Sequence, residues 1–169
     1  MGRQDQIIQE RLRKLNELRS LGINPYPSKY DVKNSSAELH EEFKSLKPET
    51  HSKTKIIIAG RLLLSRDMGK ISFGTLQDGS GRIQIVLQEK ETPKKVFDFY
   101  KKYIDAGDFI GVEGTIFRTK RGELSILTKN ITLLTKSILP LPEKWHGLQE
   151  EDERYRKRYL DILMNQEIK

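Results

Sequence analysis

Five short apolar runs with the alternation of β-strands occupy the middle of the chain, and no other feature constrains the fold as much. The third run is the clearest, because Ile83, Ile85 and Leu87 recur at every second position while the residues between them point the opposite way. Turn sequences at residues 78–81 and 119–122 separate neighbouring runs. We expect strands at residues 55–66, 71–76, 82–87, 108–118 and 123–134.

A helical pattern lies between the third and fourth expected strands. In residues 93–105, Val96, Phe97, Tyr100 and Ile104 recur at helical spacing. Five strands with a helix at this point are the layout of the OB-fold, a five-stranded Greek-key barrel that binds oligonucleotides on one face, although other small barrels have as many strands. We therefore predict a mainly β chain built on an OB-fold, with Gly60 at a bend or bulge of the first strand.

Helical segments flank the expected barrel on both sides. Residues 4–21 are expected to form a helix with Ile8, Leu12 and Leu15 on one apolar face. Arg11 and the other cations of this segment lie mostly off that face. A Ser-Ser-Ala-Glu capping box at residues 35–38 opens a short helix to about residue 46. After a Pro-rich connector at 139–148, residues 149–169 form an expected helix with an apolar stripe of Tyr155, Tyr159, Ile162 and Leu163. The predicted organisation is an N-terminal helical arm at 1–54, the barrel domain at 55–135, and a linker and further helix at 136–169.

The composition excludes several classes of chemistry. The chain has no cysteine, which excludes disulfides, thiolate metal sites and cysteine catalysis. Its histidines, His40, His51 and His146, lie in separate segments without metal-ligand spacing. The glycines around Ser80 lack the lysine of a phosphate loop, and no Gly-x-Ser-x-Gly elbow is present. We therefore expect no catalytic constellation and no metal site.

The sequence also indicates a cellular location. No apolar run approaches the length that spans a bilayer, and the first ten residues lack the apolar core of a secretory signal. We therefore expect a soluble, cytoplasmic protein with no membrane partner.

Positive charge is concentrated in the expected barrel. The net charge is +7, from 31 Lys and Arg against 24 Asp and Glu. Residues 55–135 alone carry 14 basic and 9 acidic side chains, so most of the excess lies there. Nucleic-acid-binding proteins gather positive charge on one face, and this distribution predicts an anionic partner.

Two neighbouring strands supply candidate base-binding residues. If Leu76 points into the core, alternation puts Phe73 on the outer face beside Gln84. An exposed aromatic ring stacks on a base, and a planar amide hydrogen-bonds to a base edge. The opposite register, with Phe73 in the core, fits the pattern equally well. Arg66 and Glu123 are further candidates at the edges of the same face.

Short motifs across the expected barrel form a recognisable set. They are Ala59-Gly60-Arg61, Arg66-Asp67-Met68-Gly69-Lys70, Phe73, Leu76-Gln77-Asp78, Gly81-Arg82-Ile83-Gln84 and Gly122-Glu123-Leu124-Ser125. Together they resemble the anticodon-binding OB domain of class IIb aminoacyl-tRNA synthetases, which comprise the aspartyl, asparaginyl and lysyl enzymes. The flanking segments at 12–15, 21–27, 141–148 and 154–161 resemble the lysyl branch.

The resemblance implies roles for individual residues. The ring at Phe73 would point outward and stack on the central uridine of the anticodon. Arg66 and Gln84 would contact the edge of that uridine, and Glu123 would help to read an adjacent anticodon base. Three further residues are expected as auxiliary tRNA contacts: Arg61, Lys70 and Arg82.

The resemblance also implies a larger enzyme, a lysine–tRNA ligase. Its catalytic domain is expected beyond residue 169, so this chain alone should bind tRNA without attaching lysine to it. ATP and Mg²⁺ are expected for the full-length enzyme and no cofactor for this chain. The full-length enzyme is expected to be a homodimer, whereas this chain alone can be monomeric. Two alternatives stay open: a stand-alone single-strand-binding OB protein, and a protein-interaction module, against which the basic residues argue.

Overall fold

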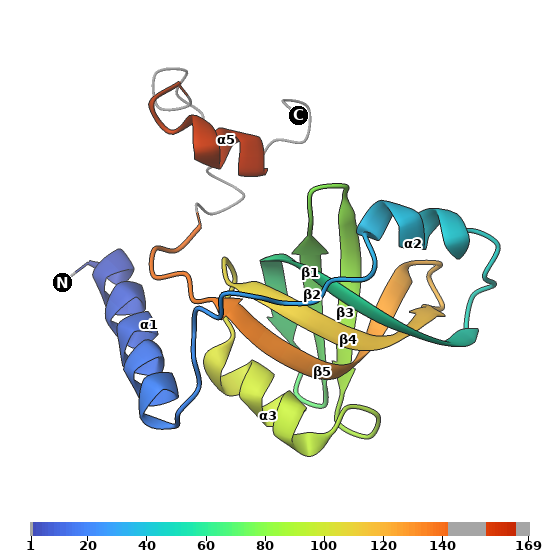
Figure 1. Cartoon of the computed structure of the whole chain (residues 1–169), viewed down its shortest axis with the longest axis horizontal. Helices are drawn as coiled ribbons and strands as arrows, with labels where there is room; N and C mark the ends of the chain where they lie inside the picture. The colour runs from blue at the N-terminus through green and yellow to red at the C-terminus, as the bar shows by residue number, and fades with distance from the viewer. Residues whose placement is uncertain (1, 142–154, 165–169) are drawn as a thin grey trace.

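The computed structural model describes residues 2–141 and 155–164 (Figure 1). The helices are α1 (Arg3–Ser20), α2 (Ser36–Glu42), α3 (Lys94–Tyr103) and α5 (Arg158–Met164). The strands are β1 (His51–Asp67), β2 (Ile71–Gln77), β3 (Arg82–Gln88), β4 (Phe109–Arg118) and β5 (Leu124–Thr135). The strand order and the helix between β3 and β4 confirm the predicted mainly β fold.

The five strands close into a barrel in the order β1-β2-β3-β5-β4. Closure depends on the length of β1, whose first part pairs with β4 and whose last part pairs with β2. All pairings are antiparallel except that of β3 with β5. The strand β1 begins at His51, four residues earlier than expected. The early start was not predicted because residues 52–55 are polar and show no apolar alternation.

Of the bend or bulge that was predicted at Gly60, the bulge is wrong. The register of β1 shifts between Leu62 and Leu64, not at the glycine. Gly60 is instead a point of close approach, because a Cβ there would lie 2.4 Å from the backbone oxygen of Gln77. The glycine therefore allows β2 to end against β1.

Alternation along the strands fills the barrel with aliphatic side chains. The predicted core face of β3 is confirmed, since Ile83, Ile85 and Leu87 are buried. Helix α3 packs onto the barrel through Phe97, Tyr100 and Tyr103. Burial raises the pKa of Tyr100 to about 12.

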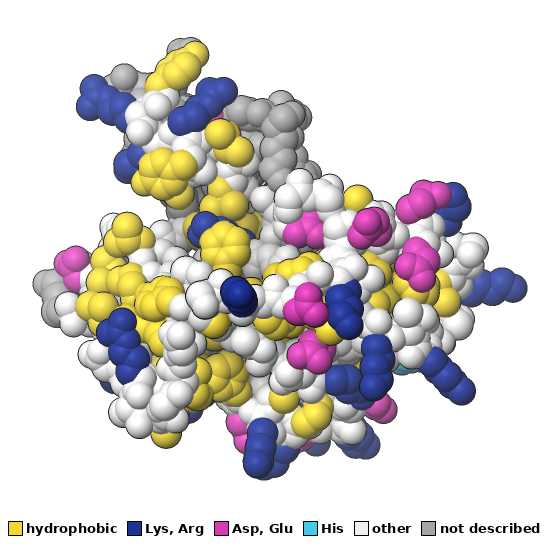
Figure 2. All heavy atoms as spheres, viewed as in Figure 1, with side chains coloured by type: hydrophobic (Ala, Val, Ile, Leu, Met, Phe, Trp, Pro, Cys, Tyr) yellow, Lys and Arg dark blue, Asp and Glu magenta, His cyan; other side chains and the backbone are white. Residues whose placement is uncertain are grey.

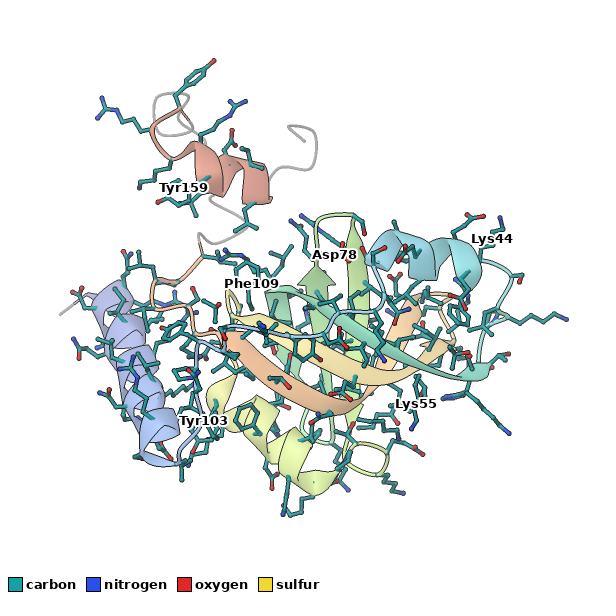
Figure 3. The ribbon with its side chains drawn as sticks, in the orientation of Figure 1. Lys44, Lys55, Asp78, Tyr103, Phe109 and Tyr159 are labelled. Atoms are coloured by element: carbon teal, nitrogen blue, oxygen red, sulfur yellow. The ribbon has the colours of Figure 1, made fainter. Side chains whose placement is uncertain are left out.

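Helix α1 is attached to the barrel by polar contacts as well as by Leu15 and Leu18, which are buried. The expectation for Arg11 is wrong: its side chain is buried and donates hydrogen bonds to the carbonyl oxygens of Ala106, Ser137 and Leu139. These carbonyls belong to the turn between α3 and β4 and to the segment after β5, outside the strands of the sheet. Tyr103 of α3, labelled in Figure 3, donates its hydroxyl to Glu17 at 2.7 Å and joins α3 to α1.

Helix α2 begins at the predicted capping box, with Ser35 as its N-cap. Its first turn is held by Asp78 of the β2–β3 turn, whose carboxylate accepts hydrogen bonds from the backbone nitrogen and hydroxyl of Ser36 at 2.6 and 2.7 Å. The same carboxylate accepts bonds from Ser80. Asp78 therefore fixes the turn and the helix together.

Acid is expected to weaken this junction. Burial opposes ionisation of the Asp78 carboxyl, but hydrogen bonds from Ser36 and Ser80 outweigh it and lower the pKa from 3.8 to about 2. Because the folded-state pKa is the lower one, the contribution of Asp78 to stability is complete above about pH 4 and is lost as the pH falls towards 2. Asp78→Asn should flatten the pH dependence of the free energy of unfolding over this range, measured by denaturant titration. An unchanged profile would contradict the role of Asp78.

The part of the chain after the barrel is described only at residues 136–141 and 155–164. The described helix there, α5, is shorter than the expected helix at 149–169, and the rest of that expected helix lies outside the described residues. Most of the connector at 139–148 also lies outside them. Tyr155, Tyr159 and Ile162 of the expected apolar stripe are exposed. In the described ranges, no helix has the length and apolar character needed to cross a membrane.

Candidate nucleic-acid interface

Two rows of paired residues cross the outer face of the barrel. Paired residues on neighbouring strands point to the same side of a sheet, so each row shares one face. The first row runs through Arg66, Phe73, Val86 and Leu127. The second row, which we call the Gln84 row, runs through Leu64, Thr75, Gln84 and Ser125. The two rows place Phe73 and Gln84 on adjacent strands of one surface.

The register of β2 puts Phe73 on this outer face. Ser72, Gly74 and Leu76 are buried and point into the barrel, so the residues between them point outward. Phe73 is half-buried and packs on a second apolar cluster of Val86, Phe117 and Leu127, outside the main core. Of the two registers that the sequence left open, the structure has the one with an outward ring. Its support below and its exposure above suit the ring to receive a planar ligand.

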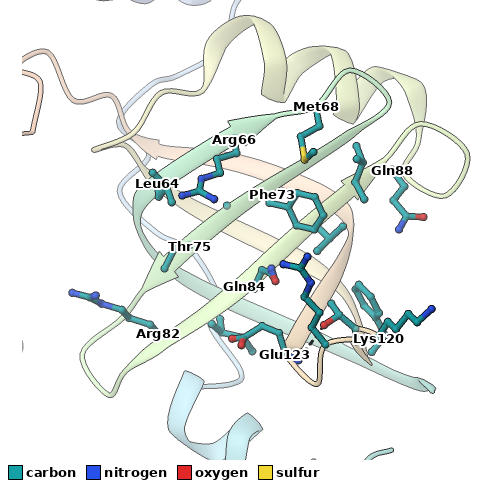
Figure 4. Close-up of a pocket in the computed structure, with 17 residues that line it drawn as sticks. Leu64, Arg66, Met68, Phe73, Thr75, Arg82, Gln84, Gln88, Lys120 and Glu123 are labelled. Atoms are coloured by element: carbon teal, nitrogen blue, oxygen red, sulfur yellow. Dashed lines mark hydrogen bonds between the residues drawn. The ribbon is translucent and has the colours of Figure 1, made fainter. Parts of the chain in front are cut away.

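A groove of about 900 Å³ surrounds this ring (Figure 4). Arg66, Phe73, Gln84 and Glu123 all line it, as does Arg82. In Figure 4, Phe73 lies at the middle of the groove, with Arg66 on one side and Gln84 below it. The structure therefore brings together all four residues that the family resemblance singled out, from β1, β2, β3 and the β4–β5 hairpin.

The groove is basic at its rim and apolar at its floor. Its charged lining residues are four cations and one carboxylate: Arg66, Arg82, Lys120, Arg121 and Glu123. Arg66, Lys120, Arg121 and Glu123 are exposed. Val86 and Phe117 lie beneath as part of the apolar floor. A cationic rim around an aromatic floor is the arrangement that binds single-stranded nucleic acid, with the rim attracting phosphates and the ring stacking on a base.

Gln84 has free hydrogen-bonding capacity in the groove. Its amide oxygen accepts a bond from the hydroxyl of Ser125 at 3.3 Å, which orients the amide. Among the described residues its amide nitrogen has no hydrogen-bond partner, so this donor is available to a ligand. The carboxylate of Glu123 likewise has no partner within the described ranges, and its backbone is fixed by two hydrogen bonds with Thr119.

Two of the expected auxiliary residues do not reach the groove. The Arg61 guanidinium lies 4.3 Å from the centre of the Phe109 ring and donates to the Gly107 carbonyl, so it turns towards β4. Lys70 lies in the β1–β2 turn, outside the groove lining. Arg82 does line the groove, held by a 2.7 Å hydrogen bond from its Nε to Gln77.

Several residues of the groove were not predicted from the sequence. Leu64 of β1 and Met68 of the β1–β2 turn are exposed apolar residues at its edge, and Lys120 and Arg121 extend the basic rim from the β4–β5 hairpin. Phe117 reaches the floor from β4. Lys120 and Arg121 could have been predicted from the sequence, because they are adjacent cations in the same turn as Glu123, which was already a candidate for this surface.

The described residues contain no group of three or more His, Asp or Glu side chains placed to hold a metal ion.

Comparisons with known proteins agree with this geometry. Residues 56–134 match the family described as "OB-fold nucleic acid binding domain", the tRNA anti-codon family. Lysine–tRNA ligase of Trichormus variabilis is 42% identical over 98% of this chain and 31% of its own length. Those of Dehalococcoides mccartyi and Moorella thermoacetica are 44% and 42% identical over 92% and 98% of this chain.

The barrel is therefore an OB-fold nucleic-acid-binding domain of the anticodon-binding type. Over nearly its whole length the chain is similar to lysine–tRNA ligases, which confirms the predicted resemblance. It spans about a third of the length of the curated relatives that it matches.

Proposed function

We propose that the groove around Phe73 binds the anticodon of a lysine tRNA. The observation that carries the proposal is the outward, half-buried ring of Phe73 at the centre of a basic groove in an anticodon-binding OB-fold. The lysine anticodon is rich in uridine, and its loop offers unstacked bases to such a ring. Single-stranded loops are the usual target of sequence-specific RNA recognition.

Each groove residue has a distinct part in the proposed recognition. Phe73 stacks on the central uridine, a contact that every base can make through its π face. The free amide nitrogen of Gln84 donates to a uridine carbonyl oxygen, and Arg66 donates from the opposite side. The carboxylate of Glu123, which has only acceptor oxygens, accepts a hydrogen bond from an adjacent base. Stacking then supplies affinity, while the hydrogen bonds supply the preference for uridine.

Gln84→Ala is the variant that separates these two parts. It should cost about 0.5–1.5 kcal/mol of preference for a uridine-centred over a cytidine-centred stem-loop, the usual net value of one hydrogen bond. Gln88→Ala, at the other end of the groove on the same strand, is the matched control and should keep most of the preference. The measurement is a pair of equilibrium titrations with the two stem-loops. Equal losses for both loops would show that Gln84 does not read the base, as expected of a non-specific single-strand binder.

We further propose the context of this domain in the longer protein. The relatives extend well beyond the matched third, and their name describes ligation of lysine to tRNA. A longer protein of this type would attach lysine to its tRNA with ATP and Mg²⁺, in the cytoplasm and as a homodimer. Aminoacylation by the full-length protein, with and without a substituted anticodon, tests this. Charging that is indifferent to the anticodon would contradict a role for the groove in tRNA selection.

A further inference from the structure

The Gln84 row does not end at the groove. Beyond Ser125 the row continues to Phe117 of β4, and from there to His51 at the start of β1. Since paired residues share a face, His51 lies on the same outer surface as Gln84. The strand β1 therefore contributes to this surface twice, with Leu64 at one end of the row and His51 at the other.

The imidazole of His51 is held as a flat, accessible ring. It stacks on the Phe117 ring with centroids 5.2 Å apart and planes inclined by 11°. Phe117 is itself nearly buried, at 8% exposure, and forms part of the groove floor, whereas His51 is exposed. Phe117 thus covers one face of the imidazole, and the exposed surface of His51 lies on its remaining side.

Backbone and side-chain contacts fix this position against the β4–β5 hairpin. The Glu49 nitrogen donates to the Arg118 carbonyl at 2.9 Å, and the Arg118 nitrogen donates to Thr50 at 3.1 Å. The Arg118 guanidinium in turn donates to the carbonyls of Gly122 and Phe43. His51 therefore lies at the foot of the hairpin whose tip carries the groove cations Lys120 and Arg121.

The charge around the start of β1 suits an RNA backbone. Lys53 and Lys55 follow His51 on β1 and are exposed. Figure 2 shows Lys and Arg side chains projecting from the end of the barrel that carries α2 and the start of β1, among acidic ones, and Figure 3 shows Lys55 there. Cations flanking a stacked ring are the elements of a single-strand binding path.

We propose that His51 is a second stacking position, which receives a base of the bound RNA strand beyond the nucleotides held at Phe73. The proposal rests on the anticodon-loop function of the groove. On the route through the Gln84 row, β3, β5 and β4 lie between β2 and the start of β1. The rings of Phe73 and His51 are separate, and Phe117 lies between the His51 ring and the groove, so the base on His51 is a different nucleotide from the base on Phe73.

Oligonucleotide length tests the proposal. We would measure Kd by fluorescence anisotropy for uridine oligomers of increasing length and for the lysine anticodon stem-loop. His51→Ala should leave the shortest oligomers unchanged and weaken the longer ones roughly 5-fold or more, the range found for loss of one base–aromatic stack. His51→Phe, which keeps a flat ring over Phe117, should retain most of the affinity.

Two results would overturn the proposal. Equal weakening at every length would mean that His51 acts only by supporting Phe117 in the groove. Unchanged affinity at every length would mean that the strand does not reach His51. In both cases a loss of binding in Phe73→Ala would leave the proposed function standing, whereas failure of the unsubstituted chain to bind any of these RNAs would overturn both.

Discussion

Phe73→Ala is expected to weaken binding of the lysine anticodon stem-loop by about 1–3 kcal/mol, roughly 5- to 150-fold in Kd. The ring lies at the centre of the groove on a floor of Val86, Phe117 and Leu127, where it offers its outer surface to a base. Alanine removes that surface and leaves the cationic rim in place. The residual affinity should therefore come mainly from the rim and depend strongly on salt.

Stability measurements separate this effect from misfolding. Loss of a fully buried phenylalanine typically costs about 3–5 kcal/mol of unfolding free energy, because a cavity remains. Phe73 is only half-buried on the outer face, so its removal leaves an open surface and a clearly smaller cost. Phe73→Tyr keeps the ring and serves as the control. A variant that unfolds readily yet binds normally once folded would contradict a stacking role.

Lys136→Met is expected to destabilise the fold by about 3–5 kcal/mol, as loss of one partner of a buried ion pair generally does. The side chains of Lys136 and Asp108 are both fully buried. The Lys136 ammonium donates to Asp108 at 2.7 Å, to Asp105, and to the Tyr103 carbonyl at 2.7 Å. Methionine fills the space but leaves the Asp108 carboxyl without its cation, and burial already raises the pKa of that carboxyl.

An exposed lysine provides the matched control. Lys94 pairs with Asp98 on the surface of α3, with 86% of its side chain exposed. Lys94→Met should leave the unfolding free energy nearly unchanged, because solvent screens such a pair. Chemical denaturation of both variants gives the comparison. Similar small effects would contradict a structural role for the buried cluster. If that outcome were observed, adding Asp108→Asn to Lys136→Met should also bring no recovery of stability.

The local patterns in the sequence predicted the barrel well. Alternation of Ile83, Ile85 and Leu87 fixed the inner face of β3, and turn residues marked the hairpins, because both signals depend only on neighbours along the chain. The same alternation left Phe73 ambiguous, since Ile71, Phe73 and Thr75 on the outward face are no less apolar than Ser72, Gly74 and Leu76 on the buried face.

Side-chain positions that depend on residues far away in the sequence could not be predicted from it. The burial of Arg11 follows from carbonyls at Ala106 and Ser137, and that of Lys136 from Asp108. Arg61 resembles a tRNA contact by its place in a motif, but Phe109 on the neighbouring strand draws its guanidinium away from the groove. Long cationic side chains reach several alternative partners, so spacing along the chain does not determine where they end.

One measurement tests the anticodon assignment most directly: a double-mutant cycle between Phe73→Ala and a lysine anticodon stem-loop whose central base is abasic. With the unsubstituted chain, removal of the base should weaken binding roughly 5- to 150-fold, as loss of one stack does. With Phe73→Ala, removal of the same base should have little further effect, because the two changes delete one contact. Independent, additive losses would show that Phe73 and the central base do not meet, and would contradict the account.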